Sequence, residues 1–87
     1  MIKERENAMT HDVITEKEFG VLELLLNNIA KSDDKETLNH RRTRFEAVTY
    51  YLWYSERITS ATRQRYEKRA DTAAEAAKRK IRKKWAL

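Results

Sequence analysis

The chain lacks cysteine and proline altogether and has a single glycine among its 87 residues. Without cysteine it has no disulfide, no thiolate metal ligand and no thiol nucleophile. A hairpin-rich β fold needs turn residues about every 8–12 positions, and a phosphate-binding loop of the glycine-rich type needs several glycines. These absences exclude thiol and disulfide chemistry, and they favour a helical fold over a β fold.

Long hydrophobic runs are absent as well. The longest apolar stretch, Val48 to Tyr54, is interrupted by Thr49 and is too short to cross a bilayer. The N-terminus carries no apolar signal region. We therefore expect no membrane contact and a cytoplasmic location. The mass of 10.4 kDa and the hydrophobic content of 40% suit one small domain with a modest core.

Helix starts are marked by side chains that can cap backbone N–H groups. Thr15 and Glu18 have the spacing of a capping box. Asp33 and Glu36 repeat this spacing before the second helical stretch, and Ile58-Thr59-Ser60 interrupts the pattern and caps the third. We predict helices at about 16–31, 34–57 and 60–84, which together form an all-α fold, a small three-helix bundle with a long basic C-terminal helix.

The predicted domain covers residues 13–87. The polar residues 1–12 lack periodicity and are expected to form a flexible N-terminal arm, within which Met9 is a second candidate translation start. Apolar residues at helical spacing define the expected core. These are Phe19, Val21, Leu22, Leu25, Leu26 and Ile29 in the first helix, Leu38, Phe45, Val48, Thr49 and Leu52 in the second, and Tyr66, Ala70, Ala73, Ala77, Ile81 and Trp85 in the third.

Positive charge is concentrated at the C-terminal end. The formal net charge is +5, yet residues 1–62 carry 9 basic and 11 acidic residues, while residues 63–87 carry 10 basic and 3 acidic ones. On a helix, several of these basic side chains lie on one side, and a row of cations of this kind can contact successive phosphates of a nucleic acid. An equally weighted alternative is a solvated face that aids solubility. The candidate nucleic-acid-binding residues are Arg65, Lys68, Arg69, Arg79, Lys80 and Lys83.

Aromatic residues crowd two turns of the second helix, where Tyr50, Tyr51, Trp53 and Tyr54 stand almost together. Burial against both neighbouring helices is the favoured interpretation, with at least one ring left exposed. The alternative makes Tyr50, Trp53 and Tyr54 a partner-binding site, because protein interfaces favour Tyr, Trp and Arg. A second apolar face on this helix also allows a homodimer.

Catalytic and metal-binding patterns are weak. Only Glu36 and His40 show helical ligand spacing, and two residues are too few for a zinc site. No serine or threonine stands in the context of a catalytic triad. We therefore expect no enzyme activity, no catalytic residue, no metal and no cofactor.

The preferred function is that of a small non-catalytic binding or regulatory protein. Its basic C-terminal helix would contact nucleic acid, DNA or RNA, or a ribonucleoprotein, mainly through phosphates. The alternative is a protein-binding inhibitor or adaptor that docks through the aromatic middle helix on an acidic protein surface, as a short phage or mobile-element gene acting on a host complex would. Exposure discriminates between them. Exposed aromatic residues favour a protein partner, and buried ones favour nucleic acid.

Overall fold

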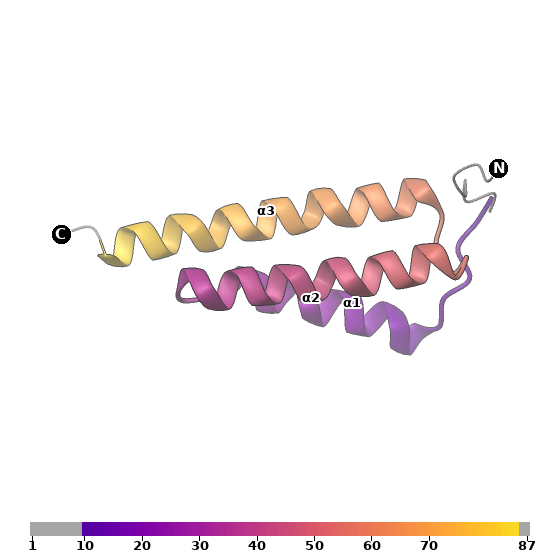
Figure 1. The fold of residues 1–87 in the computed structure, drawn as a ribbon, viewed down its shortest axis with the longest axis horizontal. Coiled ribbons are helices and arrows are strands. Elements are labelled where there is room, and N and C mark those ends of the chain that lie inside the picture. The colour runs from indigo at the N-terminus through magenta and orange to yellow at the C-terminus, as the bar shows by residue number, and fades with distance from the viewer. Residues whose placement is uncertain (1–9, 86–87) are drawn as a thin grey trace.

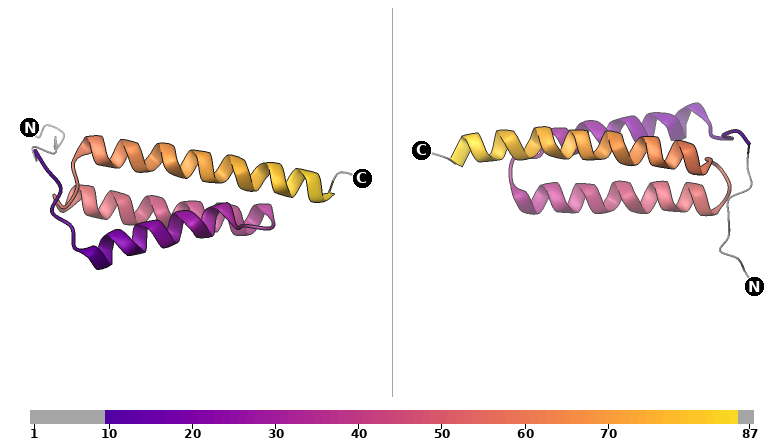
Figure 2. Two further views of the ribbon diagram at one scale, coloured as in Figure 1. Left: turned by 180° about the vertical axis from the view of Figure 1, so that it is seen from behind. Right: turned by 90° about the horizontal axis from the view of Figure 1, so that it is seen from above.

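A computed structural model describes residues 10–85 as three α-helices and confirms the predicted three-helix bundle (Figure 1). The helices are α1 (Glu16–Ala30), α2 (Lys35–Tyr54) and α3 (Ser60–Trp85). Each helix contacts both of the others (Figure 2). Residues 10–85 contain no strand and no helix with the length and apolar character needed to span a membrane.

The starts of α1 and α3 follow the predicted caps, and that of α2 lies one residue away from its predicted cap. The Thr15 hydroxyl accepts the Glu18 N–H at 3.1 Å, and the Glu18 carboxylate accepts the Thr15 N–H at 2.9 Å, which completes the capping box. The cap of α2 is Asp34, one residue after the predicted Asp33, and its carboxylate accepts the Thr37 N–H at 2.8 Å. The Thr59 hydroxyl accepts the Thr62 N–H at 3.1 Å and so caps α3. Local side-chain chemistry thus sets all three starts.

The end of α2 differs from the prediction, because the helix stops at Tyr54 and not at residue 57. Glu56 adopts a left-handed conformation with φ of 61°. The Arg57 N–H then bonds the Leu52 carbonyl at 2.7 Å, and the Glu56 N–H bonds that of Trp53 at 3.0 Å. This pair of bonds is a Schellman motif. A glutamate occupies the position that usually belongs to glycine, so no sequence signal marks this end.

The core lies along the common axis of the three helices. Its fully buried large residues include Phe45, Leu22, Ile29 and Ile58. On α3 the buried small residues are Ala70, Ala74 and Ala77, whereas Ala73, predicted for the core, is half-buried. Buried alanines let the longest helix approach the other two closely.

Two predicted core residues lie at the surface, which is a correction. Phe19 is 49% exposed and Val21 is 46% exposed. The predicted apolar arc of α1 is wider than the area that α2 and α3 cover, so its two edges face solvent. The side chain of Trp85, also predicted to end the core, lies outside the described residues.

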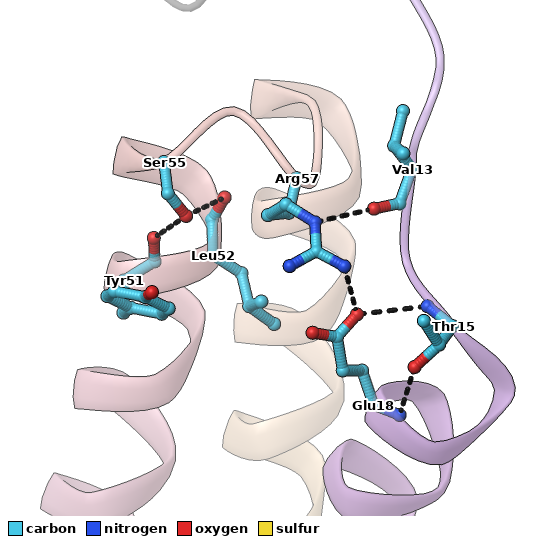
Figure 3. Close-up of polar contacts among 7 residues, drawn as sticks. All are labelled: Val13, Thr15, Glu18, Tyr51, Leu52, Ser55 and Arg57. Carbon is cyan, nitrogen blue, oxygen red and sulfur yellow. Dashed lines mark hydrogen bonds and ion pairs between the residues drawn. The ribbon is translucent and has the colours of Figure 1, made fainter.

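The segment before α1 is joined to the turn between α2 and α3. Arg57 donates to the Val13 carbonyl at 2.8 Å and to the Glu18 carboxylate at 2.5 Å (Figure 3). The Asp12 carboxylate accepts the Thr59 N–H at 2.9 Å. Packing therefore begins at Asp12. Residues 1–9 of the predicted arm lie outside the described residues.

The opposite end of the bundle leaves α3 longer than its neighbours. Figures 1 and 2 show the last turns of α3 running past the turn that joins α1 to α2. The turn itself is held by Arg41, which donates to the Asn28 carbonyl at 2.7 Å near the end of α1. Ile81 is half-buried and packs against the core, whereas Arg82, Lys83 and Lys84 are exposed. The projecting end of α3 is thus the most basic part of the described chain.

Candidate functional site

The six predicted nucleic-acid-binding residues are all exposed on α3. They form two clusters and not a continuous row: Arg65, Lys68 and Arg69 near the start of α3, and Arg79, Lys80 and Lys83 near its end. Between Lys68 and Arg79 the helix rises about 16 Å at ~1.5 Å per residue. We call these six residues the basic surface.

Small side chains fill the interval between the two clusters. Thr72, Ala73 and Ala76 of α3 face Leu26 and Ala30 of α1 across a shallow groove of about 460 Å³, with Lys68 and Arg69 at its edge. No acidic side chain lines this groove. Lys68 and Arg69 therefore border a shallow groove whose lining contains no carboxylate.

Arg69 is the most constrained member of the basic surface. Its guanidinium donates two bonds to the Glu23 carboxylate of α1, at 2.8 and 2.7 Å, and lies 5.4 Å from the centre of the Tyr66 ring. The hydrogen bonds from Arg69 lower the pKa of Glu23, and the same bonds raise the pKa of Arg69. This pair joins α1 to α3, so Arg69 has a structural role whatever else it binds.

Lys80 is similarly placed, with its amine 3.7 Å from the Asp33 carboxylate in the α1–α2 turn. Arg65 donates to the Thr62 hydroxyl at 3.0 Å, which orients its guanidinium without neutralising it. Lys68, Arg79 and Lys83 are exposed on α3. Four of the six predicted residues therefore keep their charge for a partner more fully than Arg69 and Lys80 do.

Other cations surround the end of α3. Six of the seven residues at 78–84 are basic, and the exception is Ile81. Lys78 lies 3.7 Å from Glu75, the last acidic residue of the chain. Cations near a helix C-terminus also interact favourably with the helix dipole, so part of this cluster stabilises α3 itself.

The tyrosines of α2 lie at the surface, which corrects the favoured prediction that most of them are buried. Tyr50, Tyr51 and Tyr54 are 50%, 65% and 57% exposed. The rings of Tyr50 and Tyr54 stack at 6.0 Å between centroids, with 16° between their planes. We call these three tyrosines, with Ala47 and Val21, the tyrosine surface.

Trp53 behaves differently from the tyrosines, because it is half-buried against the start of α3. Its indole N–H donates to the Ser60 hydroxyl at 2.9 Å. The Arg63 guanidinium lies 4.8 Å from the centre of the Trp53 ring and 5.3 Å from that of Tyr50. These contacts hold α2 and α3 together. Of the three predicted partner-binding residues, Tyr50 and Tyr54 face solvent and Trp53 is mainly structural.

A shallow apolar groove continues the tyrosine surface between α1 and α2. Its volume is about 350 Å³, and it is lined by Glu18, Val21, Ala47, Val48, Tyr51 and Leu52. Sequence reasoning missed Val21 and Tyr51 as surface residues because it assigned apolar positions to the core. The near-continuous apolar run from residue 47 to 54, too wide for one buried face, was the available signal.

No group of three or more potential metal ligands lies within residues 10–85. Comparison of the chain with protein-family models, with curated proteins and with solved structures finds no match. The function must therefore be argued from the two surfaces themselves.

Proposed function

We propose that this chain is a non-catalytic binding protein whose basic surface contacts the phosphates of nucleic acid, free or within a ribonucleoprotein. The observation that supports the proposal is the segregation of charge on α3. Helical spacing sets four exposed cations in one sector of α3: Arg65, Lys68, Arg79 and Lys83. Lys68 also lines the α1–α3 groove, and no acidic residue is in the lining of that groove. Segregated cations of this kind release counterions when they meet phosphates.

The dimensions of the basic surface suit a duplex. Its two clusters are about 16 Å apart along α3 at ~1.5 Å per residue. Double-stranded DNA carries one charge per about 1.7 Å of axis, so a surface of this length spans several phosphates. None of the six cations belongs to a motif that reads base edges, so the proposal is a contact with the backbone and not with sequence.

The experiment is titration of the purified protein with single-stranded and double-stranded oligonucleotides of mixed sequence at several salt concentrations. We expect binding that weakens linearly in a plot of log K against log salt, with a slope of about −0.9 per phosphate contacted in a duplex. Absence of binding at low salt would overturn the proposal.

Charge-reversing substitutions in the basic surface test whether nucleic acid binds there. Reversal of Arg69 and Lys80 is unsuitable, because it would place carboxylates beside Glu23 and Asp33 and weaken the bundle. The double variant Arg79→Glu and Lys83→Glu avoids this problem. We expect it to lose at least about tenfold in affinity and to reduce the salt slope by about 2.

The matched control is Lys17→Glu with Lys35→Glu, which changes the net charge equally on exposed positions of α1 and α2. We expect it to keep the salt slope of the unaltered protein. If both double variants lose the same affinity and slope, net charge alone explains binding, and α3 is not the site.

A second candidate function, docking of another protein, is favoured by the exposure of Tyr50 and Tyr54. Protein interfaces are enriched in tyrosine, and these two exposed rings lie together because they are four residues apart on α2. Its test is a pull-down with the unaltered protein and with Tyr50→Ala and Tyr54→Ala together. A partner retained equally by both would rule out the tyrosine surface as its site.

A further inference from the structure

We propose that the end of α3 enters the major groove of B-form DNA, so that its cations contact phosphates of both strands. The inference rests on the proposed function and deepens it, because it names double-helical DNA as the partner and a groove as the place of contact. We define the projecting end of α3 as residues 78–84, of which all but Ile81 are basic. No acidic residue follows Glu75 in the sequence.

The flank of α3 that faces α2 changes its sign of charge along the helix. Asp71 and Glu75 stand four residues apart on this flank, and the Asp71 carboxylate pairs with Arg42 of α2. Lys78 and Arg82 continue the same row, three and four residues further on. The flank is therefore acidic beside α2 and becomes basic at the projecting end.

The projecting end carries cations on more than one side of the helix. At 3.6 residues per turn, the directions of its six basic side chains cover about 240° of the helix circumference. Those of Arg65, Lys68 and Arg69, near the start of α3, cover about 100° on the same basis. A flat or single-stranded partner meets one side of a helix, so the wider distribution fits a partner that surrounds the helix on two sides.

The dimensions of the projecting end match the major groove of B-form DNA. An α-helix with its side chains is about 10–12 Å in diameter, and this groove is about 12 Å wide and about 8.5 Å deep. From Lys78 to Lys84 the helix rises about 9 Å at ~1.5 Å per residue. Phosphates of the two strands border the two edges of the groove, so cations on opposite flanks of the helix can contact different strands.

The bundle leaves the projecting end accessible. Figures 1 and 2 show the last turns of α3 running past the turn that joins α1 to α2. Ile81 is half-buried against the core, and the side chains at 82–84 are exposed. A shallow depression of about 700 Å³ at this end is lined, within the described residues, by cations alone: Arg79, Lys80, Arg82 and Lys83. Phosphates that approach this depression meet no carboxylate in its lining.

Groove shape favours a DNA duplex over an RNA duplex. The major groove of A-form RNA is deep and too narrow for protein side chains to read, and a single strand has no groove. A contact through the basic surface alone needs phosphates but no groove, so it would bind the two duplexes with similar affinity. Preference for the DNA duplex is therefore the property that separates the groove contact from the proposed function.

The first test compares a DNA duplex, an RNA duplex of the same sequence and one DNA strand at about 0.1 M salt, by fluorescence anisotropy with the unaltered protein. We expect the DNA duplex to bind at least about tenfold more tightly than the RNA duplex and the single strand. An RNA duplex or a single strand bound as tightly would overturn the groove contact and leave the proposed function in place. Absence of binding to all three would overturn both.

Substitutions on the flank that faces α2 test the contact with the second strand. The variant Lys78→Gln with Arg82→Gln leaves all six residues of the basic surface unchanged and introduces a good helix former. We expect it to bind the DNA duplex at least about tenfold more weakly, with a salt slope reduced by about 2, and to keep its affinity for the RNA duplex within a few fold. The matched control, Lys17→Gln with Arg44→Gln, also removes one exposed lysine and one exposed arginine and should keep the preference for DNA.

Two outcomes with these variants would overturn the proposal. If the flank variant keeps both its helices, by circular dichroism, and its affinity for the DNA duplex, α3 meets DNA through the basic surface alone. If the flank variant and the control lose the same affinity, net charge explains the loss. The comparison of the three nucleic acids uses the unaltered protein, so it decides the proposal even where the flank variant loses helix.

Discussion

At residue 56 a glutamate holds the left-handed backbone conformation that ends α2, with φ of 61°. For an L residue with a Cβ this region costs about 1–2 kcal/mol, whereas glycine adopts it freely. The strain is tolerated because the Schellman bonds of Glu56 and Arg57 satisfy two carbonyls at the end of α2. The fold therefore contains a local conflict that a single substitution can relieve.

We expect Glu56→Gly to be more stable than Glu56→Ala by about 1 kcal/mol, since both remove the carboxylate and only glycine relieves the backbone. Urea denaturation of the two variants measures the difference. Equal stability would mean that the turn relaxes around alanine and that the left-handed conformation carries no appreciable strain.

The same residue shows where sequence reasoning is limited. The sequence indicates helix starts where side chains make the capping bonds themselves, as those of Thr15, Glu18 and Asp34 do. Glu56 gives no sequence signal for the end of α2, because the surrounding structure and not the glutamate side chain imposes the conformation that ends the helix. Starts were therefore predicted to within a residue, whereas the end of α2 was placed three residues too late.

At the scale of elements, two carboxylates of α1 connect this helix to the rest of the bundle. The Thr15 N–H, with Arg57, lowers the pKa of Glu18, and Arg69 lowers the pKa of Glu23 (Figure 3 shows the Glu18 pair). A lowered pKa in the folded state means that the unfolded chain binds the proton more tightly. The stabilisation is therefore complete above the ordinary Glu pKa of about 4.3 and is lost as the pH falls through the folded value.

We expect the free energy of unfolding to fall between about pH 5 and pH 3, with Glu23→Gln flattening that fall. The part assigned to Glu23 is about 1 kcal/mol or less, because the pair with Arg69 is partly exposed. Urea denaturation across this pH range measures it. Glu75→Gln is the control, and an equal flattening by Glu75→Gln would assign the effect to net charge.

The packing of the helices also explains which surface residues could be predicted from the sequence. The charge sector of α3 was predictable, because polar residues far from the core keep the positions that helical spacing gives them. The exposure of the apolar residues was not predictable, because helical spacing gives the direction of a side chain but not whether a neighbouring helix covers it. These residues are Phe19, Val21, Tyr50 and Tyr54. The buried face of α2 consists of Leu38, Phe45, Thr49 and Leu52, and helical spacing sets the tyrosines on the opposite side, which neither α1 nor α3 covers.

At the scale of the whole molecule, the chain separates charge from apolar surface. The basic surface lies on α3, and the apolar groove opens between α1 and α2, on the side away from α3. The basic surface and the apolar groove therefore use different side chains, so a substitution in one leaves the other in place.

This separation predicts that the two surfaces contribute independently to binding. Tyr50→Ala with Tyr54→Ala should keep the affinity for mixed-sequence oligonucleotides within a few fold and keep the salt slope, whereas Arg79→Glu with Lys83→Glu should lose at least about tenfold in affinity, because the cations and not the rings meet the phosphates. Fluorescence anisotropy with labelled oligonucleotides measures both variants, and circular dichroism verifies that both keep their helices. A tyrosine variant that keeps its helices and loses as much affinity as the charge variant would mean that the rings belong to the nucleic-acid site, as stacking platforms for bases do.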